Sequence, residues 1–255
     1  MAVRGAVGEA LRGKVSAYHG FREETGAPVS RLEGPGRDIV VIVSFGEDWS
    51  IDGEGLRSFA AGLRDRQVAT RHEGRSHGIQ IDLAPPAAHR LFGLPLHELA
   101  YRQVPLEDVL DEPLLAERLH DAGSWEARFR LLDALLAKRL DDAGPASPGI
   151  VWAWTRLVET HGALRIGELT RELGWSRKRI VAHFREEIGL PPKRAAKLLR
   201  FERVRALAES ATRPDWAWIA RKAGYYDQAH LINDFRSVTG RTPETFFQDS
   251  VAPAA

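Results

Sequence analysis

Hydrophobic and polar positions follow two different periods along this chain of 255 residues. Residues 40–45 (VVIVSF) form a continuous apolar run and residues 78–83 (GIQIDL) alternate, and glycine- or proline-rich turns lie beside each segment. Such short segments predict β-strands. Residues 124–140 instead place apolar side chains three and four positions apart, which predicts an amphipathic α-helix with Ser124 as its N-cap. The first half of the chain is therefore predicted to contain strands followed by helices.

The second half shows almost only helical spacing. It begins after residues 141–149 (DDAGPASPG), where two prolines and two glycines predict a linker between domains. Glycine or proline separates seven predicted helices, at residues 150–160, 166–173, 177–187, 192–208, 215–223, 228–238 and 243–248. We therefore predict an α+β protein whose C-terminal domain is all-α with seven helices.

The two halves differ in charge. Residues 1–148 contain 18 Lys and Arg against 23 Asp and Glu, whereas residues 149–255 contain 18 against 12. The net charges are thus −5 and +6, and the basic residues concentrate between residues 176 and 205. This asymmetry indicates a polyanionic partner for the second half, although a solvated helix face gives the same composition.

The chain has no cysteine. This excludes disulfides, zinc sites built on thiolates and cysteine nucleophiles, and it is typical of a reducing compartment. The N-terminus lacks the apolar core of a signal peptide, and no run reaches the roughly 18 apolar residues of a membrane span. We expect a cytoplasmic protein with no membrane partner.

An internal repeat lies within the basic half. Its units pair at an offset of 51 residues, as Phe184/Phe235, Arg185/Arg236, Gly189/Gly240 and Pro192/Pro243. Upstream the offset is 50, as between Gly174 and Gly224, so the second unit has one extra residue in its turn. We pair the aromatic Trp175 with Tyr226 across this turn.

Each repeat unit has the pattern of a helix-turn-helix motif: a short helix, a glycine suited to positive φ, an N-capping residue and a second helix. We expect Ser176 and Asp227 to be the caps. Polar and basic side chains on the outer faces of the second helices can donate hydrogen bonds to base edges and phosphates in a major groove. The predicted DNA-binding residues are Ser176, Arg177, Lys178, Val181, Arg185, Asp227, Gln228, Ala229, His230, Asn233 and Arg236.

These motifs resemble the C-terminal DNA-binding domain of AraC/XylS-type transcriptional regulators. The resemblance implies two helix-turn-helix units joined by a linker helix, so that one chain reaches two successive major grooves, and it implies tighter base contacts in the first unit. Asn233 stands where a basic residue is frequent in that family. The matching residues are Ile219-Ala220, Ala223-Gly224-Tyr225, Asp227-Gln228, His230, Phe235-Arg236, Gly240, Thr242-Pro243 and Phe246.

The N-terminal half resembles the small cupin-like β-barrel sensor domains that precede such DNA-binding domains. The resemblance rests on VVIVSF, on GIQIDLAPPAAHRLFGLP and on the helix that follows. It implies an effector-sensing or dimerisation domain at residues 1–143, a linker at 144–149 and the DNA-binding domain at 150–250. Residues 131–140 either pack on their own barrel, which we favour, or contribute to a dimer.

Candidate chemistry is sparse. His72, Glu73 and His77 could form a cupin-type metal site, but the histidines are five residues apart in a loop that contains glycine. No nucleophile frame or phosphate-binding loop occurs. We therefore predict no catalytic residue, no metal, no cofactor and no enzyme activity. Tyr226 is interpreted as partly exposed. Four tryptophans at helix starts are interpreted as core anchors: Trp152, Trp154, Trp216 and Trp218.

Together these patterns predict a sequence-specific DNA-binding transcriptional regulator controlled by a small-molecule effector. Its predicted partners are double-stranded DNA, an effector of unknown identity and, for an activator, RNA polymerase, with a homodimer left open. Two alternatives remain at this stage. One is a cupin-type metal-dependent enzyme with an accessory DNA-binding domain, and the other is a ligand-independent architectural DNA-binding protein.

Overall fold

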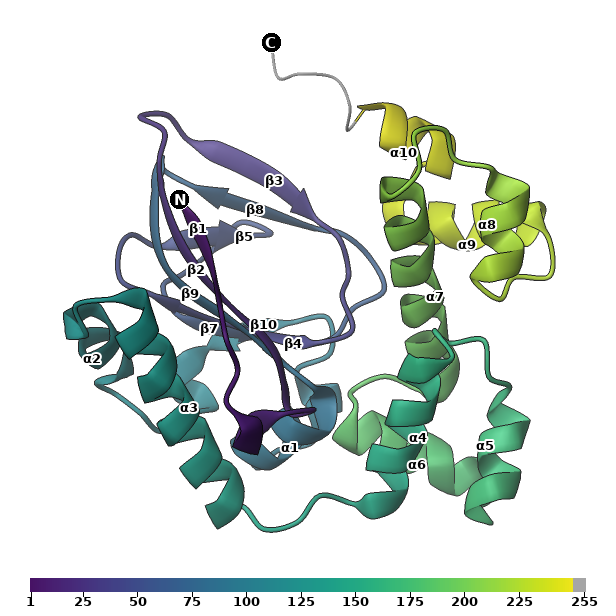
Figure 1. Cartoon of the computed structure of the whole chain (residues 1–255), viewed down its shortest axis with the longest axis horizontal. Helices are drawn as coiled ribbons and strands as arrows, with labels where there is room; N and C mark the ends of the chain where they lie inside the picture. The colour runs from purple at the N-terminus through teal and green to yellow at the C-terminus, as the bar shows by residue number, and fades with distance from the viewer. Residues whose placement is uncertain (250–255) are drawn as a thin grey trace.

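The computed structural model describes residues 1–249 and contains an N-terminal β-rich region followed by a helical region (Figure 1). This arrangement confirms the predicted α+β class. Ser250, the last residue of the predicted DNA-binding domain, lies outside the described residues. Within residues 1–249, no helix combines the length and the apolar character needed to cross a membrane.

Two antiparallel sheets form the N-terminal region and face each other in Figure 1. The first has six strands in the order β1 (Ala2–Gly5), β2 (Val15–Glu24), β9 (Arg75–Leu83), β4 (Ile39–Ser44), β7 (Phe59–Ala61) and β10 (Gln103–Pro105). The second has four, in the order β3 (Val29–Glu33), β8 (Val68–His72), β5 (Trp49–Ile51) and β6 (Glu54–Leu56).

The central strands β4 and β9 confirm the two strands predicted from the sequence. They pair antiparallel, with Val41 opposite Ile81. Because successive side chains on a strand point to opposite faces, Val41 and Ile81 join the main buried core, whereas Val40 and Ile42 line the space between the two sheets. Strand β4 is therefore apolar on both faces of the sheet.

The outer face of this sheet is covered by helices. The hydroxyl of Ser124 accepts a hydrogen bond from the Ala127 N–H at 3.2 Å, which confirms it as the N-cap of α3. Leu132 and Leu136 on α3 are buried in the core, so this helix packs on its own domain as favoured above. The helices of this region are η1 (Glu9–Leu11), α1 (Pro85–Phe92), η2 (Leu96–Glu98), η3 (Leu106–Asp108), α2 (Leu115–Asp121) and α3 (Trp125–Asp142).

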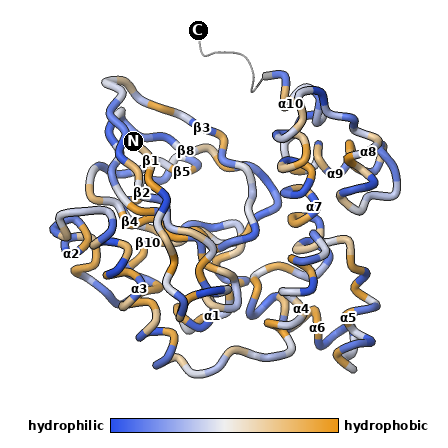
Figure 2. The backbone as a smooth tube through the Cα atoms, viewed as in Figure 1, coloured by the Kyte–Doolittle hydropathy of each residue, from blue (hydrophilic) through white to orange (hydrophobic). Residues whose placement is uncertain are grey.

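Seven α-helices follow among the described residues, as predicted, and their ends agree with the predicted ends to within two residues. Figure 2 shows hydrophobic and hydrophilic positions alternating along these helices, which is typical of amphipathic packing. The helices are α4 (Pro148–Glu159), α5 (Ile166–Leu173), α6 (Arg177–Glu187), α7 (Pro192–Glu209), α8 (Trp216–Lys222), α9 (Gln228–Thr239) and α10 (Pro243–Asp249).

The helical region is divided between two hydrophobic cores. The larger core runs from the six-stranded sheet through α1 and α3 into α4, α5, α6 and the first half of α7. The smaller core begins at Phe201 on α7 and contains the buried faces of α8 and α9. The first part of the helical region therefore shares its core with the sheets, whereas the second part has a core of its own.

Candidate nucleic-acid interface and adjoining cavity

The first helix-turn-helix unit consists of α5 and α6. Helix α5 ends at Gly174, whose φ of 65° is left-handed and suits a residue without Cβ. The Ser176 hydroxyl accepts a hydrogen bond from the Arg179 N–H at 3.2 Å, which confirms Ser176 as the cap of α6. Ile180 and Phe184 are fully buried and attach α6 to the core. The opposite face of α6 is therefore turned outward.

The outward face of α6 is cationic. Arg177, Lys178 and Arg185 are exposed, and Val181 is half-buried beside them. No intramolecular salt bridge engages these three cations within residues 1–249. Arg179 differs, because its guanidinium lies over the Trp175 ring at 4.4 Å and stabilises the turn. The charges of Arg177, Lys178 and Arg185 therefore remain free for an external anion.

The second unit consists of α8 and α9. The Asp227 carboxylate accepts a hydrogen bond from the His230 N–H at 2.7 Å, which confirms Asp227 as the cap of α9. Leu231 and Phe235 are buried, and the Phe235 ring centroid lies 5.0 Å from that of Phe201 on α7. The second recognition helix is thus held by the linker helix.

The outward face of α9 is more polar than cationic. The His230 ring is only half exposed, because it packs on its edge against Tyr225 with 5.1 Å between the centroids. Its Nε2 also lies 3.9 Å from the Asp234 carboxylate. The predicted contact residues of this unit are all exposed at the residue level: Gln228, Ala229, His230, Asn233 and Arg236.

The turn of the second unit corrects one sequence prediction. The N–H of Trp175 donates to the Thr170 carbonyl, and the N–H of Tyr225 donates to the Ala220 carbonyl, both at an offset of 50 residues. Trp175 therefore corresponds to Tyr225 and not to Tyr226. Tyr226 is the additional residue, and it is 91% exposed, well beyond the partial exposure expected.

The tryptophan predictions hold for one residue and fail for another. Trp154 is buried as a core anchor, and Trp152 and Trp216 are half-buried. Trp218 is 41% exposed, because the hydrophobic face of α8 is supplied by Ile219 and Ala220 instead. The prediction of Trp218 as a core anchor was therefore wrong.

Helix α7 connects the two units. It has 18 residues, which corresponds to about 27 Å at 1.5 Å per residue. Arg200 on α7 lies 3.4 Å from the Asp234 carboxylate of α9 and donates a hydrogen bond to the Gly162 carbonyl at 3.0 Å. One arginine thus ties the second recognition helix to the end of α4.

The N-terminal region makes hydrogen bonds to the linker helix and to the second unit. At the start of α7, Arg194 donates a hydrogen bond at 2.6 Å to the hydroxyl of Tyr101, which in turn donates to Asp65 at 2.8 Å. Farther along the chain, the N–H of Gln67 reaches the carbonyl of Val238 on α9 at 3.4 Å. Contacts between residues so distant in sequence could not be predicted from periodicity.

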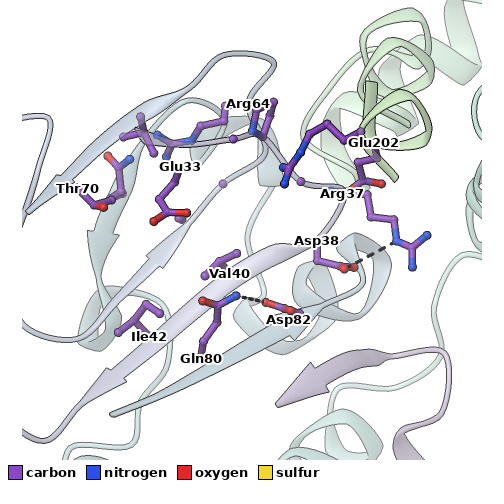
Figure 3. Close-up of a pocket in the computed structure, with 18 of the residues that line it drawn as sticks. Glu33, Arg37, Asp38, Val40, Ile42, Arg64, Thr70, Gln80, Asp82 and Glu202 are labelled. Atoms are coloured by element: carbon purple, nitrogen blue, oxygen red, sulfur yellow. Dashed lines mark hydrogen bonds and ion pairs between the residues drawn. The ribbon is translucent and has the colours of Figure 1, made fainter. Parts of the chain in front are cut away.

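A cavity of about 650 Å³ lies between the two sheets and extends to α7 (Figure 3). Its floor carries Val40 and Ile42 on β4, with Gln80 and Asp82 on β9. Arg64 and Glu202 also line it, the latter from the linker helix. The size is typical of small-molecule sites. The sequence offered no signal for this cavity beyond the barrel itself.

Glu202 connects the cavity rim to the linker helix. Its carboxylate accepts a hydrogen bond from the Arg37 backbone N–H at 2.7 Å. Burial raises the pKa of Glu202 to about 7, although the bond from Arg37 and the charge of that residue oppose the rise. Burial also raises the pKa of Asp38. This rim therefore contains acidic groups that are costly to ionise.

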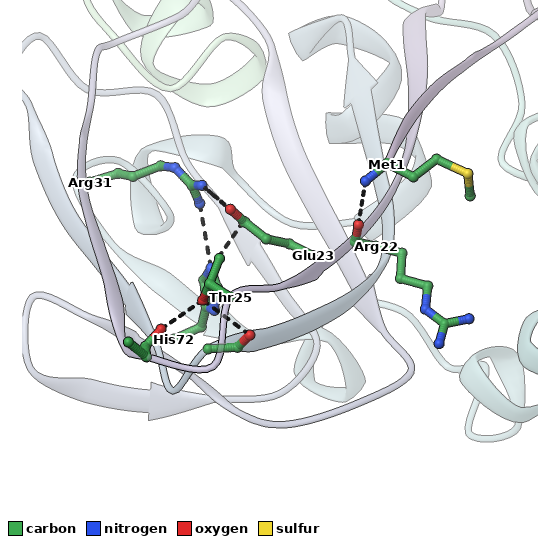
Figure 4. A network of polar contacts seen from close by, with 8 residues as sticks. Met1, Arg22, Glu23, Thr25, Arg31 and His72 are labelled. Atoms are coloured by element: carbon green, nitrogen blue, oxygen red, sulfur yellow. Dashed lines mark hydrogen bonds and ion pairs between the residues drawn. The ribbon is translucent and has the colours of Figure 1, made fainter. Parts of the chain in front are cut away.

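The histidines considered as metal ligands lie in different surroundings. His72 is buried, with its Nε2 3.2 Å from the Glu23 carboxylate, in a network that also includes Arg31 (Figure 4). His77 packs instead against the rings of Phe45 and Trp125. Among residues 1–249, no group of three potential ligands gathers in metal-binding geometry. The structure thus does not bring His72 and His77 together.

Residues 169–249 match the protein family described as "Helix-turn-helix domain". The C-terminal region is an AraC-type helix-turn-helix domain. The chain is also 27% identical over 222 residues to the "Probable thc operon regulatory protein" of Rhodococcus erythropolis. That alignment covers 81% of this chain but only 57% of the length of the Rhodococcus protein.

The complete fold is similar to that of ToxT from Vibrio cholerae. A wild-type ToxT structure with a bound unsaturated fatty acid has a TM-score of 0.52 and 9% identity, covering 94% of this chain and 99% of ToxT. A variant of apo ToxT has a TM-score of 0.50 and 9% identity, covering 91% and 97%. At this level of identity the similarity concerns the fold alone: a β-rich region followed by a helical region.

Proposed function

We propose that this protein is a sequence-specific DNA-binding transcriptional regulator whose N-terminal cavity binds a small-molecule effector. The observation that carries the proposal is the pair of capped recognition helices on one rigid linker helix. Each presents an exposed face of basic or hydrogen-bonding side chains, and the cations of the first face form no salt bridge with any of residues 1–249. Together with the regulatory relative, this favours a regulator over an enzyme or an architectural protein.

The two faces suggest different roles in DNA binding. Arg177, Lys178 and Arg185 supply charge, so the first unit would bind phosphates and guanine edges most strongly. Gln228 and Asn233 suit adenine edges in the second groove. Ser176 and Asp227 would act by fixing the helix N-termini, whose backbone N–H groups favour a nearby phosphate. The remaining proposed contacts are Val181, Ala229, His230 and Arg236.

The proposed effector site is the cavity between the sheets and α7. A molecule in it would touch the barrel on one side and the linker helix on the other. The ToxT fold is known with a small molecule bound, which supports a ligand-binding role for the N-terminal region here. Effector binding would then change how α7, and hence both recognition helices, are held.

The direct test is selection from a random pool of duplex DNA by the purified 255-residue chain. We expect an enriched site with two half-sites about 10 base pairs apart, one per major groove. The absence of sequence preference would favour the architectural alternative. Stoichiometric bound metal, measured by mass spectrometry, would favour the enzyme alternative.

Variants then assign the half-sites. Arg177→Ala or Lys178→Ala should each weaken binding by roughly 1 to 3 kcal/mol if the side chain contacts a base. His230→Ala should affect the other half-site only. Glu168→Ala, an acidic change on α5, is a matched control and should not relax sequence preference. Footprints unchanged in all three test variants would contradict the assignment of the recognition faces.

Further partners follow from this role. A regulator of bacterial type works in the cytoplasm, and as an activator it would contact RNA polymerase. A homodimer would use the half-buried face of α3 that carries Leu131 and Leu135. Analytical ultracentrifugation of the free protein tests the dimer, and a single species at monomer mass over micromolar concentrations would contradict it.

A further inference from the structure

A buried arginine that forms no salt bridge within residues 1–249 lines the cavity. Arg64 lies three residues after the end of β7 and is only 8% exposed. Within residues 1–249 its guanidinium forms no salt bridge with a carboxylate. With the Gln103 amide oxygen facing it, both Nη1 and Nη2 donate to that oxygen, Nη1 at 2.6 Å, and Nη2 also lies 3.5 Å from the Arg102 carbonyl. Both acceptors are neutral.

This arrangement is energetically unusual. Buried charges are normally paired, because removing an ion from water costs several kcal/mol in practice. Burial indeed lowers the pKa of Arg64, and the charge of Asp52, which lies beyond salt-bridge distance, opposes this only in part. An anion that entered the cavity would supply the missing counterion. The planar guanidinium is suited to a carboxylate, which it can bind through two parallel hydrogen bonds.

A second donor in the cavity lacks a partner. Within the described part of the chain, the indole N–H of Trp49 is buried and makes no hydrogen bond, and Trp49 lines the same cavity as Arg64. The ring edge meets His72 and Phe21 in T-shaped contacts, which fix its position. Buried donors are rarely left unpaired, so the indole N–H points to a ligand with an acceptor.

The remaining wall limits the shape and charge of the ligand. Ile42, Ile51, Phe59 and Val68 form one apolar cluster between the sheets. The opposite rim carries carboxylates, including Asp38, Asp82 and Glu202. Burial raises the pKa of Asp38 and of Glu202. The nearby Arg37 and Arg205 already lie beside Asp38 and Glu209, so these two cations are not free to pair with a second acid group. A ligand with a single negative charge and an apolar body is therefore the best complement.

We propose that the cavity binds an organic monocarboxylate whose acid group pairs with Arg64 and whose apolar body packs between the sheets near Trp49. This inference rests on the proposed function only for the cavity's role as effector site. The binding site itself is defined by Arg64, by the unpaired indole N–H and by the apolar cluster.

The test is isothermal titration calorimetry of the 255-residue protein with three carboxylic acids whose apolar parts differ in size and shape: hexanoate, benzoate and 2-naphthoate. The neutral primary amide of each acid is titrated for comparison. We expect at least one acid to bind at least tenfold more tightly than its amide, since hydrogen bonds to charged groups are the stronger ones. Amides that bind as tightly as the acids, or no acid binding below about 1 mM, would overturn the proposal.

Variants locate the site. Arg64→Gln should abolish the preference for acid over amide. Arg66→Gln is the matched control, because Arg66 is exposed over the Tyr101 ring outside the cavity and should leave the preference unchanged. A preserved preference in Arg64→Gln would refute the assignment. If that variant fails to fold, Arg64→Lys keeps the charge without the planar fork and should weaken acid binding several-fold.

DNA binding separates this inference from the proposed function. Arg64 lies in the N-terminal region, away from the recognition faces, so Arg64→Gln should bind the selected DNA site as wild type does without acid. Selective DNA binding with no acid binding would overturn the ligand inference alone. Acid binding without any selected DNA site would overturn the proposed regulator and leave the ligand site standing.

Discussion

The first helix-turn-helix unit packs into a core that it shares with the β-sheets, whereas the second unit packs on α7 in a separate core. Both units use the same scheme of a left-handed glycine, a side-chain cap and two buried anchors one turn apart. Their supports nevertheless differ. Repetition in the sequence reproduces the motif, but the contacts made by the rest of the chain determine how rigidly each motif is held.

The largest effect should come from the buried anchors. Phe184→Ala and Phe235→Ala each remove a fully buried ring, so each should lower the free energy of unfolding by about 3 to 5 kcal/mol. Phe235→Ala should loosen the second unit alone, whereas Phe184→Ala should destabilise the sheets as well. Hydrogen exchange followed residue by residue measures this. Equal loss of protection in the β-strands for both variants would contradict the separation into two cores.

The linker helix allows a second test through pH. The pKa of Glu202 is raised to about 7 in the folded chain, so the folded state retains a proton that the unfolded state loses above about pH 4.5. Its stabilising contribution is complete below that pH and is lost as the pH rises through about 7. Glu202→Gln keeps a neutral acceptor for the Arg37 N–H and should flatten this dependence.

Urea unfolding at pH 5 and pH 8 measures the difference. Relative to the glutamine variant, wild type should lose about 1 to 3 kcal/mol between the two values. Glu209→Gln, an exposed change on the same helix, is the control and should follow wild type. Parallel pH profiles for wild type and Glu202→Gln would contradict the assignment.

The caps should have smaller effects and should differ between the units. Ser176→Ala and Asp227→Ala each remove one side-chain acceptor at a helix N-terminus, which costs about 1 kcal/mol. The Asp227 carboxylate also interacts favourably with the helix dipole, so its removal should cost more. Thermal unfolding compares them. A larger loss of stability in Ser176→Ala than in Asp227→Ala would contradict this order. It would indicate that the surrounding core, and not the chemistry of the cap, determines the stability change in the first unit.

The smallest effect is expected at the extra turn residue. Tyr226 is 91% exposed, so Tyr226→Ala should change stability by less than about 0.5 kcal/mol. Tyr225→Ala is the paired control and should be clearly destabilising, because Tyr225 is buried against the Arg200 guanidinium. Comparable losses of stability in the two variants would contradict the assignment of Tyr226, and not Tyr225, as the inserted residue.

Local patterns predicted the local features well. Helices α5 and α6 begin and end where helical spacing and glycine placed them, and Ser124, Ser176 and Asp227 cap as expected, because these features depend on a few neighbouring residues. The strands at residues 40–45 and 78–83 were predicted for the same reason.

Features that depend on distant contacts were missed. The insertion was assigned to the turn but not to Tyr226, because two adjacent tyrosines are equivalent until one of them is buried. The periodicity of the sequence does not predict the hydrogen bond between Glu202 and Arg37. It also does not predict that Arg64 is buried without a salt bridge to any described residue. The cavity likewise arises only when two sheets and α7 meet.

The shared core has a consequence for recombination between relatives. Leu96 of the N-terminal region and Leu190 beside the first unit are buried in one cluster, and a Cβ added at Gly189 would approach the Leu96 carbonyl oxygen at 3.0 Å. A chimera that joined this C-terminal region to a foreign sensor without a matching residue at Leu96 would expose Leu190. We therefore expect chimeras between relatives to fold best when the junction lies after the first helix-turn-helix unit, within α7.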